Sequence, residues 1–440
     1  MKKVALHTLG CKVNTYETAA MQQSLEAQGY DIVPFSDKAD IYIVNTCTVT
    51  NIADRKSRQM LHKAKKMNKE AVVVAVGCYV QSAREALEAD DTVDIIIGNN
   101  KKKDLIQILD DYEANHFYKG AVIDINETSE YETLSINSSG EHTRAFIKIQ
   151  DGCNMFCTYC IIPFARGRVR SRKAEDIIAE ITKLVNAGYK EAVLTGIHLS
   201  SYGIDFENKE EYNLLSLIEQ INEISGLDRI RLGSLEPRIV TEKFVLTLSK
   251  MKKFCPHFHL SLQSGCDVTL KRMNRRYDTK EFKEKCELLR KYFDNPAITT
   301  DIIAGFPGET EEEFENTYEF LKNIAFAEMH VFKYSKRSGT KAAIMENQIS
   351  DSIKHVRSEK LIKLGQVMSD KFIKNYEDKI LSILVEEETE IENTKYLAGY
   401  SKEYIKVLIP ANTAIKGEII DVKFDKKYDN TTILCERITK

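Results

Sequence analysis

The chain has 440 residues, which corresponds to about three domains of ordinary size. Acidic and basic residues nearly cancel, with 66 Asp and Glu against 63 Lys and Arg, and 43% of the residues are hydrophobic. This composition excludes a chain that is disordered throughout and a protein that is basic over its whole surface. No apolar run approaches the roughly 20 residues of a membrane span, and the N-terminal MKKVALHTLGCKVN turns polar too early for a signal peptide. We therefore expect a cytoplasmic protein without a membrane partner, in which any nucleic-acid binding comes from local basic patches.

The first 125 residues alternate short β-branched runs with helical stretches. The runs are VALHTL, DIYIVN, VVVAVG and DIIIG. Such alternation is typical of parallel sheets, so the predicted fold class is α/β, with an N-terminal parallel α/β sheet domain over residues 1–125. Residues 126–143, NETSEYETLSINSSGEHT, are poor in aliphatic side chains and rich in Ser, Thr, Glu and Asn, which predicts a linker.

A second series of strands and helices fills residues 144–372. Strands are expected at AFIKIQ, EAVLTG, RIRLGS, HFHLSL, AITTDIIAGF and EMHVFKY. Six strand–helix units predict a full or partial (β/α) barrel. From residue 376 to 440 the pattern changes to short strands without long helices, which predicts a small all-β barrel.

Ten cysteines in a chain without an export signal favour metal binding or catalysis over a disulfide framework. Only Cys153, Cys157 and Cys160 are closely spaced, in the run DGCNMFCTYC after the first expected barrel strand. Three soft thiolates select iron–sulfur, copper(I) or zinc. Structural zinc normally takes four protein ligands, whereas a [4Fe-4S] cluster held by three cysteines leaves one iron open to a small molecule. The cluster is the favoured interpretation; the alternatives are a zinc site completed by a distant residue and a coincidental spacing.

With Tyr159 before its last cysteine, this run resembles the motif of the radical S-adenosylmethionine superfamily. The resemblance implies that S-adenosylmethionine chelates the open iron and that an electron from the cluster cleaves it to a 5′-deoxyadenosyl radical. Four further segments resemble that superfamily's cofactor-binding strand ends, although each alone also fits an ordinary turn. They are LTGIHLSSYG at 194–203, SLEP at 234–237, HLSLQSG at 259–265 and DIIAGFPGET at 301–310. The resulting candidates for cofactor contact are Tyr159, Gly196, Glu236 and Gln263.

Three isolated cysteines each follow an expected strand of the N-terminal sheet: Cys11, Cys47 and Cys78. The carboxyl ends of parallel strands share one edge, where ligands bind, so three thiols should converge there. A single buried cysteine is more often a core residue, which is the alternative. The segments LGCKVNTYET, VNTCTVT and VGCY resemble the cysteine motifs of the methylthiotransferase family. That resemblance implies a second [4Fe-4S] cluster on these residues, a radical SAM domain at 144–372 and a C-terminal TRAM domain, an RNA-binding module, at 376–440.

Within that family, LGCKVNTYET and QSGCDVTLKRMNRRY at 263–277 look most like the branch that acts on N6-threonylcarbamoyladenosine at position 37 of tRNA. The branch acting on isopentenyladenosine usually reads GCQMN-like at the first cysteine, and a third branch modifies a ribosomal protein. The resemblance implies a transferase that adds a methylthio group to C2 of the base, and an electron donor such as flavodoxin or ferredoxin. Modification of one of the other two substrates, or a non-catalytic iron–sulfur redox protein that binds RNA, are the alternatives.

Basic patches offer surfaces for the tRNA anticodon loop. The expected phosphate contacts lie in two stretches, Arg166, Arg168, Arg170 and Arg172, then Lys271, Arg272, Arg275 and Arg276. A third basic stretch covers residues 55–66, and for all three the alternative is a solvated charged face. Residues 376–440 hold 13 acidic and 10 basic residues, a balance that is unusual for an RNA-binding module.

Overall fold

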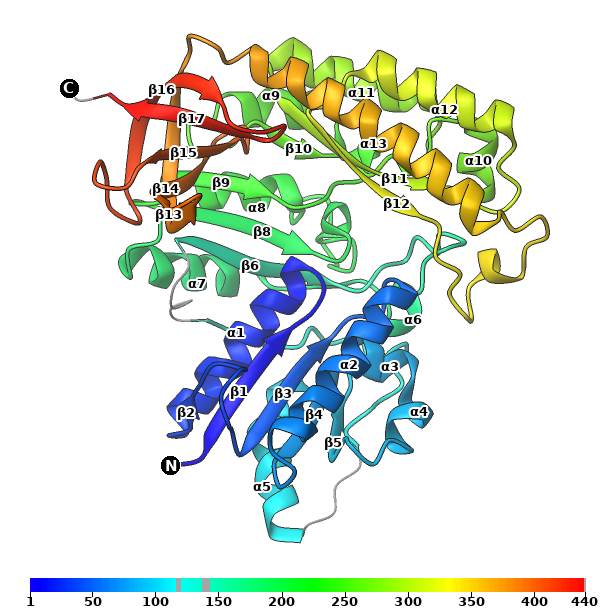
Figure 1. Ribbon diagram of the computed structural model, residues 1–440, viewed down its shortest axis with the longest axis vertical. Coiled ribbons are helices and arrows are strands. Elements are labelled where there is room, and N and C mark those ends of the chain that lie inside the picture. Colours follow the sequence, from blue (N-terminus) through cyan, green and yellow to red (C-terminus); the bar gives the residue numbers. More distant parts are fainter. Residues whose placement is uncertain (116–119, 137–142, 439–440) are drawn as a thin grey trace.

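The structure is a computed structural model that describes residues 1–115, 120–136 and 143–438 (Figure 1). A five-stranded parallel sheet is followed by two sheets that form an open barrel and then by a small closed barrel. The predicted α/β class, with its partial barrel and its C-terminal β-barrel, is confirmed. Among the described residues, no helix is both long and apolar enough to cross a membrane.

The N-terminal sheet has the strand order β2-β1-β3-β4-β5, and its pairs run parallel. Helices cover it, and α1 packs on β1 with one face and on the first strand of the open barrel with another. The strands are β1 (Lys3–Thr8), β2 (Asp31–Ile32), β3 (Ile41–Thr46), β4 (Val72–Gly77) and β5 (Ile95–Ile97). The helices are α1 (Lys12–Ala27), α2 (Asn51–Met67), α3 (Cys78–Ser82), α4 (Arg84–Glu88), the 3-10 turn η1 (Lys102–Asp104) and α5 (Leu105–Asn115).

The central region consists of two sheets, ordered β7-β6-β8-β9 and β10-β11-β12. Isolated parallel bridges, Ile230 to Phe254 and Leu235 to Leu260, continue the curvature from one sheet into the other. Its strands are β6 (Arg144–Asp151), β7 (Arg170–Ser171), β8 (Glu191–Gly196), β9 (Arg229–Leu232), β10 (His257–His259), β11 (Ala297–Ala304) and β12 (Glu328–Lys333). The edges β7 and β12 leave the barrel open on one side.

Helices cover the outside of these sheets, and the apolar residues between the two layers form the largest buried core. The helices are α6 (Ile162–Arg166), α7 (Ala174–Asn186), α8 (Leu214–Asn222), α9 (Glu242–Ser249), α10 (Asp267–Arg272), α11 (Thr279–Tyr292), α12 (Glu311–Ile324) and α13 (Asp351–Lys374), with 3-10 turns η2 (Leu199–Ser201), η3 (Pro237–Ile239) and η4 (Lys341–Ile344). Capping boxes begin α8 and α12, the second through Thr310 and Glu313, as its GFPGET sequence indicates.

The C-terminal barrel closes in the order β13-β14-β15-β17-β16. Its strands are β13 (Ile380–Ile391), β14 (Thr394–Ser401), β15 (Lys406–Pro410), β16 (Ile419–Lys427) and β17 (Thr432–Arg437). Two buried arginines of β9 attach it to the open barrel: Arg229 donates to the carbonyls of Tyr400 and Ser382, and Arg231 to those of Ser401 and Lys402. The closed barrel therefore has a fixed position beside the central sheets.

The described part of the predicted linker, residues 126–136, contains no helix or strand, but it packs against the rest of the protein. Leu134 and Ile136 are buried in the central core, and Glu132 is 2% exposed. The Leu134 carbonyl accepts a hydrogen bond from the Tyr16 hydroxyl, and the Ile136 amide donates to Glu180. Two aliphatic side chains are enough to fasten this polar segment. Residues 137–142 lie outside the described residues.

A buried cluster of charges joins the N-terminal sheet to the open barrel. Glu17 of α1, with no exposed side-chain surface, accepts hydrogen bonds from Arg166 at 2.6 Å and Lys148 at 2.7 Å, and Lys102 lies 3.3 Å away. Asp151, at the end of β6, contacts Lys148 at 2.6 Å and Arg166 at 3.1 Å. These cations hold the pKa values of both carboxyls below their usual range despite burial, which acts in the opposite direction. The cluster contains residues of the N-terminal sheet domain and of the open barrel, and it holds these two parts in a fixed relative position.

Gly152 makes the sharp turn between β6 and the cysteine run. Its φ is +73°, and a Cβ placed there would lie 1.8 Å from the carbonyl oxygen of Arg168. Gly188, at the end of α7, has a φ of +100° but open space around the equivalent position. Only the first glycine is therefore required by both backbone conformation and close packing.

We predict that Gly152→Ala lowers the free energy of unfolding by roughly 2–5 kcal/mol, since a left-handed alanine and a steric overlap add together. Gly188→Ala should cost only about 1 kcal/mol, because it carries the conformational penalty alone. Thermal unfolding of both variants measures the difference. Equal shifts in Tm would show that the approach to Arg168 is not a constraint.

Candidate functional site

The structure brings the three N-terminal cysteines to one edge of the sheet. The strands β1, β3 and β4 are paired side by side; Cys47 and Cys78 directly follow β3 and β4, and Cys11 follows the end of β1 by three residues. A Cβ on Gly10 would lie 2.9 Å from the Cβ of Cys47, so a glycine is needed for the two loops to meet. Burial, the main cause, and the neighbouring charges of Cys78 and Cys11 raise the pKa of Cys47 to about 11.

The sulfur of Cys78 accepts hydrogen bonds from two side chains. Arg166 Nε donates at 3.1 Å, and Asn99 Nδ2 donates at 3.6 Å. N–H groups directed at a cysteine sulfur stabilise its deprotonated form, which is the form that binds iron. The donor set therefore fits a metal-bound thiolate.

The second triad lies in the loop between β6 and α6, at the carboxyl end of a barrel strand. Cys153, Cys157 and Cys160 line one cavity together. Burial raises the pKa of Cys153 to about 11 and that of Cys160 to about 12, so both are thiols until a metal replaces the proton. Arg275 Nη1 donates to the Cys157 sulfur at 3.3 Å, and the Met155 amide donates to that of Cys153 at 3.4 Å.

The cavity beside this loop, which we call the smaller cavity, has a volume of about 350 Å³. Of the predicted cofactor contacts, Tyr159, Glu236 and Gln263 line it, together with the three cysteines. Gln263 has a φ of +72° and bridges to Ile302 of β11, which turns its backbone at the strand end. Thr50, three residues after Cys47, also lines this cavity, although none of the three N-terminal cysteines does.

Three buried polar atoms of the smaller cavity lack a hydrogen-bond partner among the described residues: Glu236 Oε1, His198 Nε2 and the Tyr334 hydroxyl oxygen. Burial raises the pKa of Glu236, and burial with the charges of Arg275 and Arg276 lowers that of His198 to about 4. Such atoms are costly unless a ligand satisfies them. S-adenosylmethionine carries an ammonium group and ribose hydroxyls that would do so, and the residues present therefore fit this cofactor.

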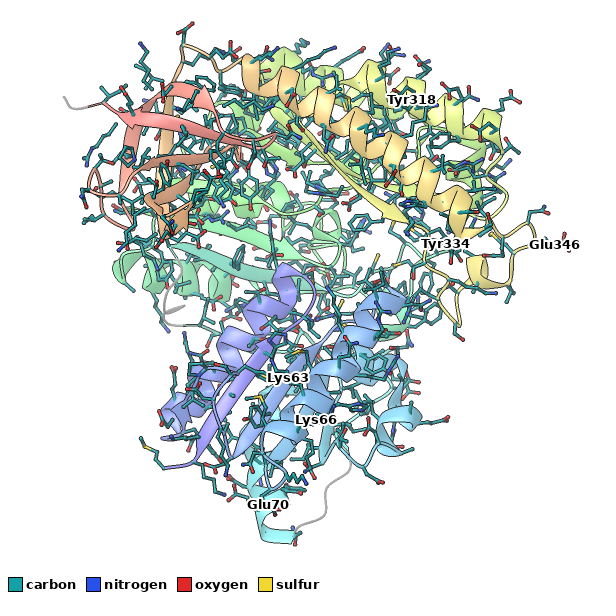
Figure 2. All side chains as sticks on the ribbon, viewed as in Figure 1. Lys63, Lys66, Glu70, Tyr318, Tyr334 and Glu346 are labelled. Atoms are coloured by element: carbon teal, nitrogen blue, oxygen red, sulfur yellow. The ribbon has the colours of Figure 1, made fainter. Side chains whose placement is uncertain are left out.

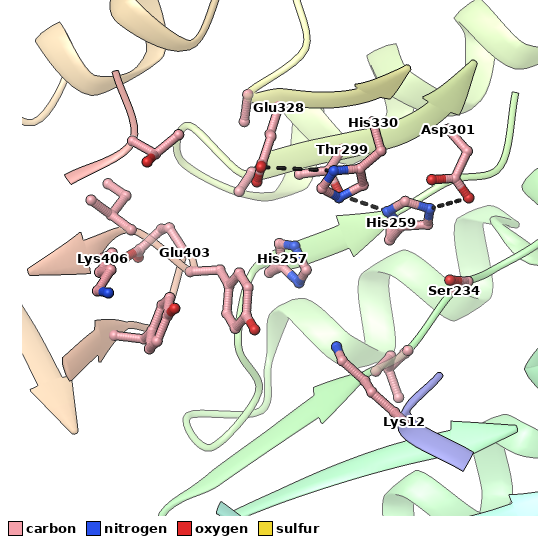
Figure 3. A pocket seen from close by; sticks show the side chains of 18 of the residues that line it. Lys12, Ser234, His257, His259, Thr299, Asp301, Glu328, His330, Glu403 and Lys406 are labelled. Atoms are coloured by element: carbon pink, nitrogen blue, oxygen red, sulfur yellow. Dashed lines mark hydrogen bonds and ion pairs between the residues drawn. The ribbon is translucent and has the colours of Figure 1, made fainter. Parts of the chain in front are cut away.

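A larger cavity of about 690 Å³ adjoins the smaller one, since Ser234 and Asp301 line both (Figure 3). Gly196 lies here rather than in the smaller cavity, although the next residues, Ile197 and His198, line the smaller one. Cys11 borders the larger cavity as well. The second triad and Cys11 of the first therefore line two adjoining cavities, whereas Cys47 and Cys78 line neither.

The prediction that the first arginine stretch contacts phosphate is wrong for three of its four members. Arg166, Arg170 and Arg172 are at most 3% exposed. Arg166 pairs with Glu17, Arg170 donates to the Arg166 carbonyl at 2.9 Å, and Arg172 pairs with Glu180. Arg168 alone is exposed.

The second basic stretch likewise contains both residues that are paired within the protein and residues that are exposed. Arg275 is held by the Cys157 sulfur and the Ser261 carbonyl, and Arg272 pairs with Glu313 at 2.9 Å. For these two residues, the contacts within the protein replace the expected contacts with phosphate. Lys271 and Arg276 are exposed. On α2, Lys63 and Lys66 are exposed too (Figure 2), but they lie in the last turns of the helix, at the end away from Cys47.

Two residues at the site, Asn99 and His198, were not predicted from the sequence. Asn99 follows β5 at the same sheet edge as the cysteines, so the strand-end rule could have found it. His198 lies inside a segment that the sequence analysis had singled out, but its imidazole offered no ligand spacing.

Comparisons with known proteins agree with this geometry. Residues 3–98 match the family described as "Uncharacterized protein family UPF0004", and residues 147–321 match the Radical SAM superfamily. The chain is 42% identical over 430 residues to "Threonylcarbamoyladenosine tRNA methylthiotransferase MtaB" of Bacillus subtilis (strain 168), covering 97% of this chain and 94% of that protein. It is 35% identical over 429 residues to "tRNA-2-methylthio-N(6)-dimethylallyladenosine synthase" of Clostridium tetani (strain Massachusetts / E88), covering 96% and 93%.

Among solved structures, the chain resembles the radical S-adenosylmethionine methyltransferase TsrM of Kitasatospora setae, determined with cobalamin and a [4Fe-4S] cluster bound. The TM-score is 0.55 at 14% identity, with 78% of this chain and 74% of that one covered. At this identity the likeness concerns the fold alone.

We predict that Arg166→Gln lowers the iron content of the reconstituted protein from about eight to about four per chain, because Cys78 loses its main hydrogen-bond donor. The slope of tRNA affinity against salt should not change, since Arg166 is buried. Arg168→Gln is the matched control, which should keep its iron and reduce that slope by about 0.7–0.9 for one lost phosphate contact. A change in the slope for Arg166→Gln at full iron content would contradict the assignment.

Proposed function

Because the chain belongs to the family of radical S-adenosylmethionine tRNA methylthiotransferases, we propose that it replaces the C2 hydrogen of N6-threonylcarbamoyladenosine at position 37 of tRNA by a methylthio group. The observation that carries this proposal is that one cysteine triad lines the smaller cavity, while Cys11 of the other triad lines the larger cavity that adjoins it. One triad would serve the radical chemistry and the other the supply of sulfur. A non-catalytic redox protein would have no need for two such sites at adjoining cavities.

The proposal assigns each triad one [4Fe-4S] cluster with an open iron. Cys153, Cys157 and Cys160 would hold the cluster that binds S-adenosylmethionine, and Cys11, Cys47 and Cys78 the cluster that carries the sulfur. Bound at the first site, S-adenosylmethionine supplies a carbon radical that can break an unreactive C–H bond. Tyr159, Glu236 and Gln263 would orient it, and the buried walls of the smaller cavity would keep water away.

The choice of modified base is supported by the curated relatives and by the cavity. The B. subtilis relative named for threonylcarbamoyladenosine is more similar than the C. tetani relative named for dimethylallyladenosine. The larger cavity is lined by ionisable side chains, among them Lys12, His257 and His259. A polar substituent suits such walls better than an aliphatic one. Methylthiolation of dimethylallyladenosine is the second candidate, supported by the 35% identity alone.

The exposed residues Arg168, Lys271 and Arg276 are the remaining candidates for phosphate contact, and the C-terminal barrel is proposed as a TRAM domain. The domain limits at 1–125, 144–372 and 376–440, the flavodoxin or ferredoxin donor and the cytoplasmic location stay predictions. A tRNA substrate supports the cytoplasmic location.

The proposal predicts that the reconstituted enzyme, given S-adenosylmethionine, a reductant and tRNA bearing N6-threonylcarbamoyladenosine, yields a nucleoside heavier by one CH₂S unit. Mass analysis of digested tRNA measures it. Cys47→Ala should still produce 5′-deoxyadenosine but no methylthiolated nucleoside, because only the sulfur-bearing site is lost. The triple variant Cys153→Ala, Cys157→Ala, Cys160→Ala should produce neither.

The same assay can be run with tRNA that bears dimethylallyladenosine (isopentenyladenosine) instead. Product from that tRNA alone would favour the second candidate. Product at wild-type level from Cys47→Ala would remove the N-terminal triad from the reaction.

A further inference from the structure

The larger cavity is built from all three parts of the chain (Figure 3). Lys12 comes from α1 of the N-terminal sheet, His257 from β10 of the open barrel and Tyr404 from the loop after β14 of the closed barrel. The ring of Tyr404 lies between the other two: its centroid is 5.7 Å from Lys12 Nζ and 4.8 Å from the stacked imidazole of His257. This wall exists only when the three parts are assembled.

Lys12 carries an uncompensated positive charge. Its ammonium faces the rings of Phe146 and Tyr404, and no hydrogen bond or ion pair to it occurs among the described residues. Two arginines that contact the same Tyr404 ring are neutralised, Arg144 by Glu386 at 2.8 Å and Arg231 by Glu191 at 2.6 Å. An anion placed beside this ammonium would supply the partner that it lacks.

The neighbouring His257 also has an unsatisfied atom. It is 6% exposed, and its Nδ1 has no hydrogen-bond partner within the described part of the chain. A buried polar atom of this kind needs a ligand or a water. Lys12 and His257 therefore present two unmet hydrogen-bonding groups on one wall.

The acidic residues of the cavity lie elsewhere along it. Asp301 is 3.2 Å from His259, and Glu328 is 3.8 Å from His330. Glu403 lies with Lys406 on the side of the closed barrel, whereas Lys12 lies between that side and Asp301 (Figure 3). The part of the cavity wall at Lys12 is therefore the one suited to an anion.

We propose that Lys12, together with His257, binds the carboxylate of the threonylcarbamoyl group and so determines which modified adenosine is accepted. This inference rests on the proposed function. The base would lie where the two cavities meet, near Cys11 and Ser234, and its N6 substituent would extend along the larger cavity. A carboxylate at the tip of a substituent can reach this half-buried ammonium, whereas a backbone phosphate would have to bring its ribose inside.

The test compares two anticodon stem-loop RNAs that differ only at position 37, which carries either adenosine or N6-threonylcarbamoyladenosine. The wild-type protein, reconstituted with iron, should bind the modified RNA more tightly. Lys12→Gln should reduce this preference by roughly ten- to hundredfold, the range of a hydrogen bond to a charged group. Lys406→Gln, a lysine of the same cavity on the side of the closed barrel, is the matched control and should keep the preference.

An equal loss of affinity for both RNAs in Lys12→Gln would overturn the proposal, because it would show a phosphate contact. A preference at the wild-type level would overturn it too. Since Lys12 follows a cluster cysteine, its variant could lose iron; His257→Gln, which is distant in sequence from the cysteines, should then show a reduced preference. An unchanged preference in that variant contradicts the inference.

Failure of the proposed function is a different result. In that case the wild-type enzyme itself gives no methylthiolated threonylcarbamoyladenosine. Failure of the inference leaves that product in place and shows only in the binding ratios of the variants.

Discussion

Glu17 is a carboxylate without solvent exposure, and the arrangement of the two cysteine triads depends on what surrounds it. Arg166 comes from the helix after one triad, and its guanidinium bonds both to Glu17 and to the sulfur of Cys78 in the other triad. Counting Lys102, Lys148, Arg166 and Arg170 against Glu17, Asp151 and Glu132 gives four cations and three anions in the cluster. The surplus positive charge lies beside Cys78, where a thiolate would balance it.

Removing one partner of such a buried group typically costs about 3–5 kcal/mol, because the other charge is left without compensation. The boundary between the sheet and the barrel therefore has little freedom to shift. This rigidity matters for the chemistry, since a carbon radical and a sulfur donor must act on the same carbon atom. The closed barrel is fixed in a similar manner by Arg229 and Arg231, and Tyr404, which Arg231 contacts, lies on the wall of the larger cavity.

The cysteines could be predicted because their signal is local: a short spacing in one case and the residue after a strand in the other. The charge cluster could not. Two partners of Arg166, Asn14 and Glu17, lie about 150 positions earlier, and sequence alone does not reveal that these side chains meet. The same limit explains the arginines assigned to RNA, because charge is visible in a sequence and burial is not. Around Leu134, the polar composition concealed two aliphatic anchors.

The claim that the buried cluster aligns the two sites is tested most directly with Glu17→Gln. The measurement is the ratio of methylthiolated nucleoside to 5′-deoxyadenosine formed in one reaction. We expect 5′-deoxyadenosine to persist, since the radical site keeps its cysteines, and the ratio to fall by at least about tenfold, as misplacement by about 1 Å can cost much more than that. A ratio equal to that of the wild-type enzyme would contradict the account.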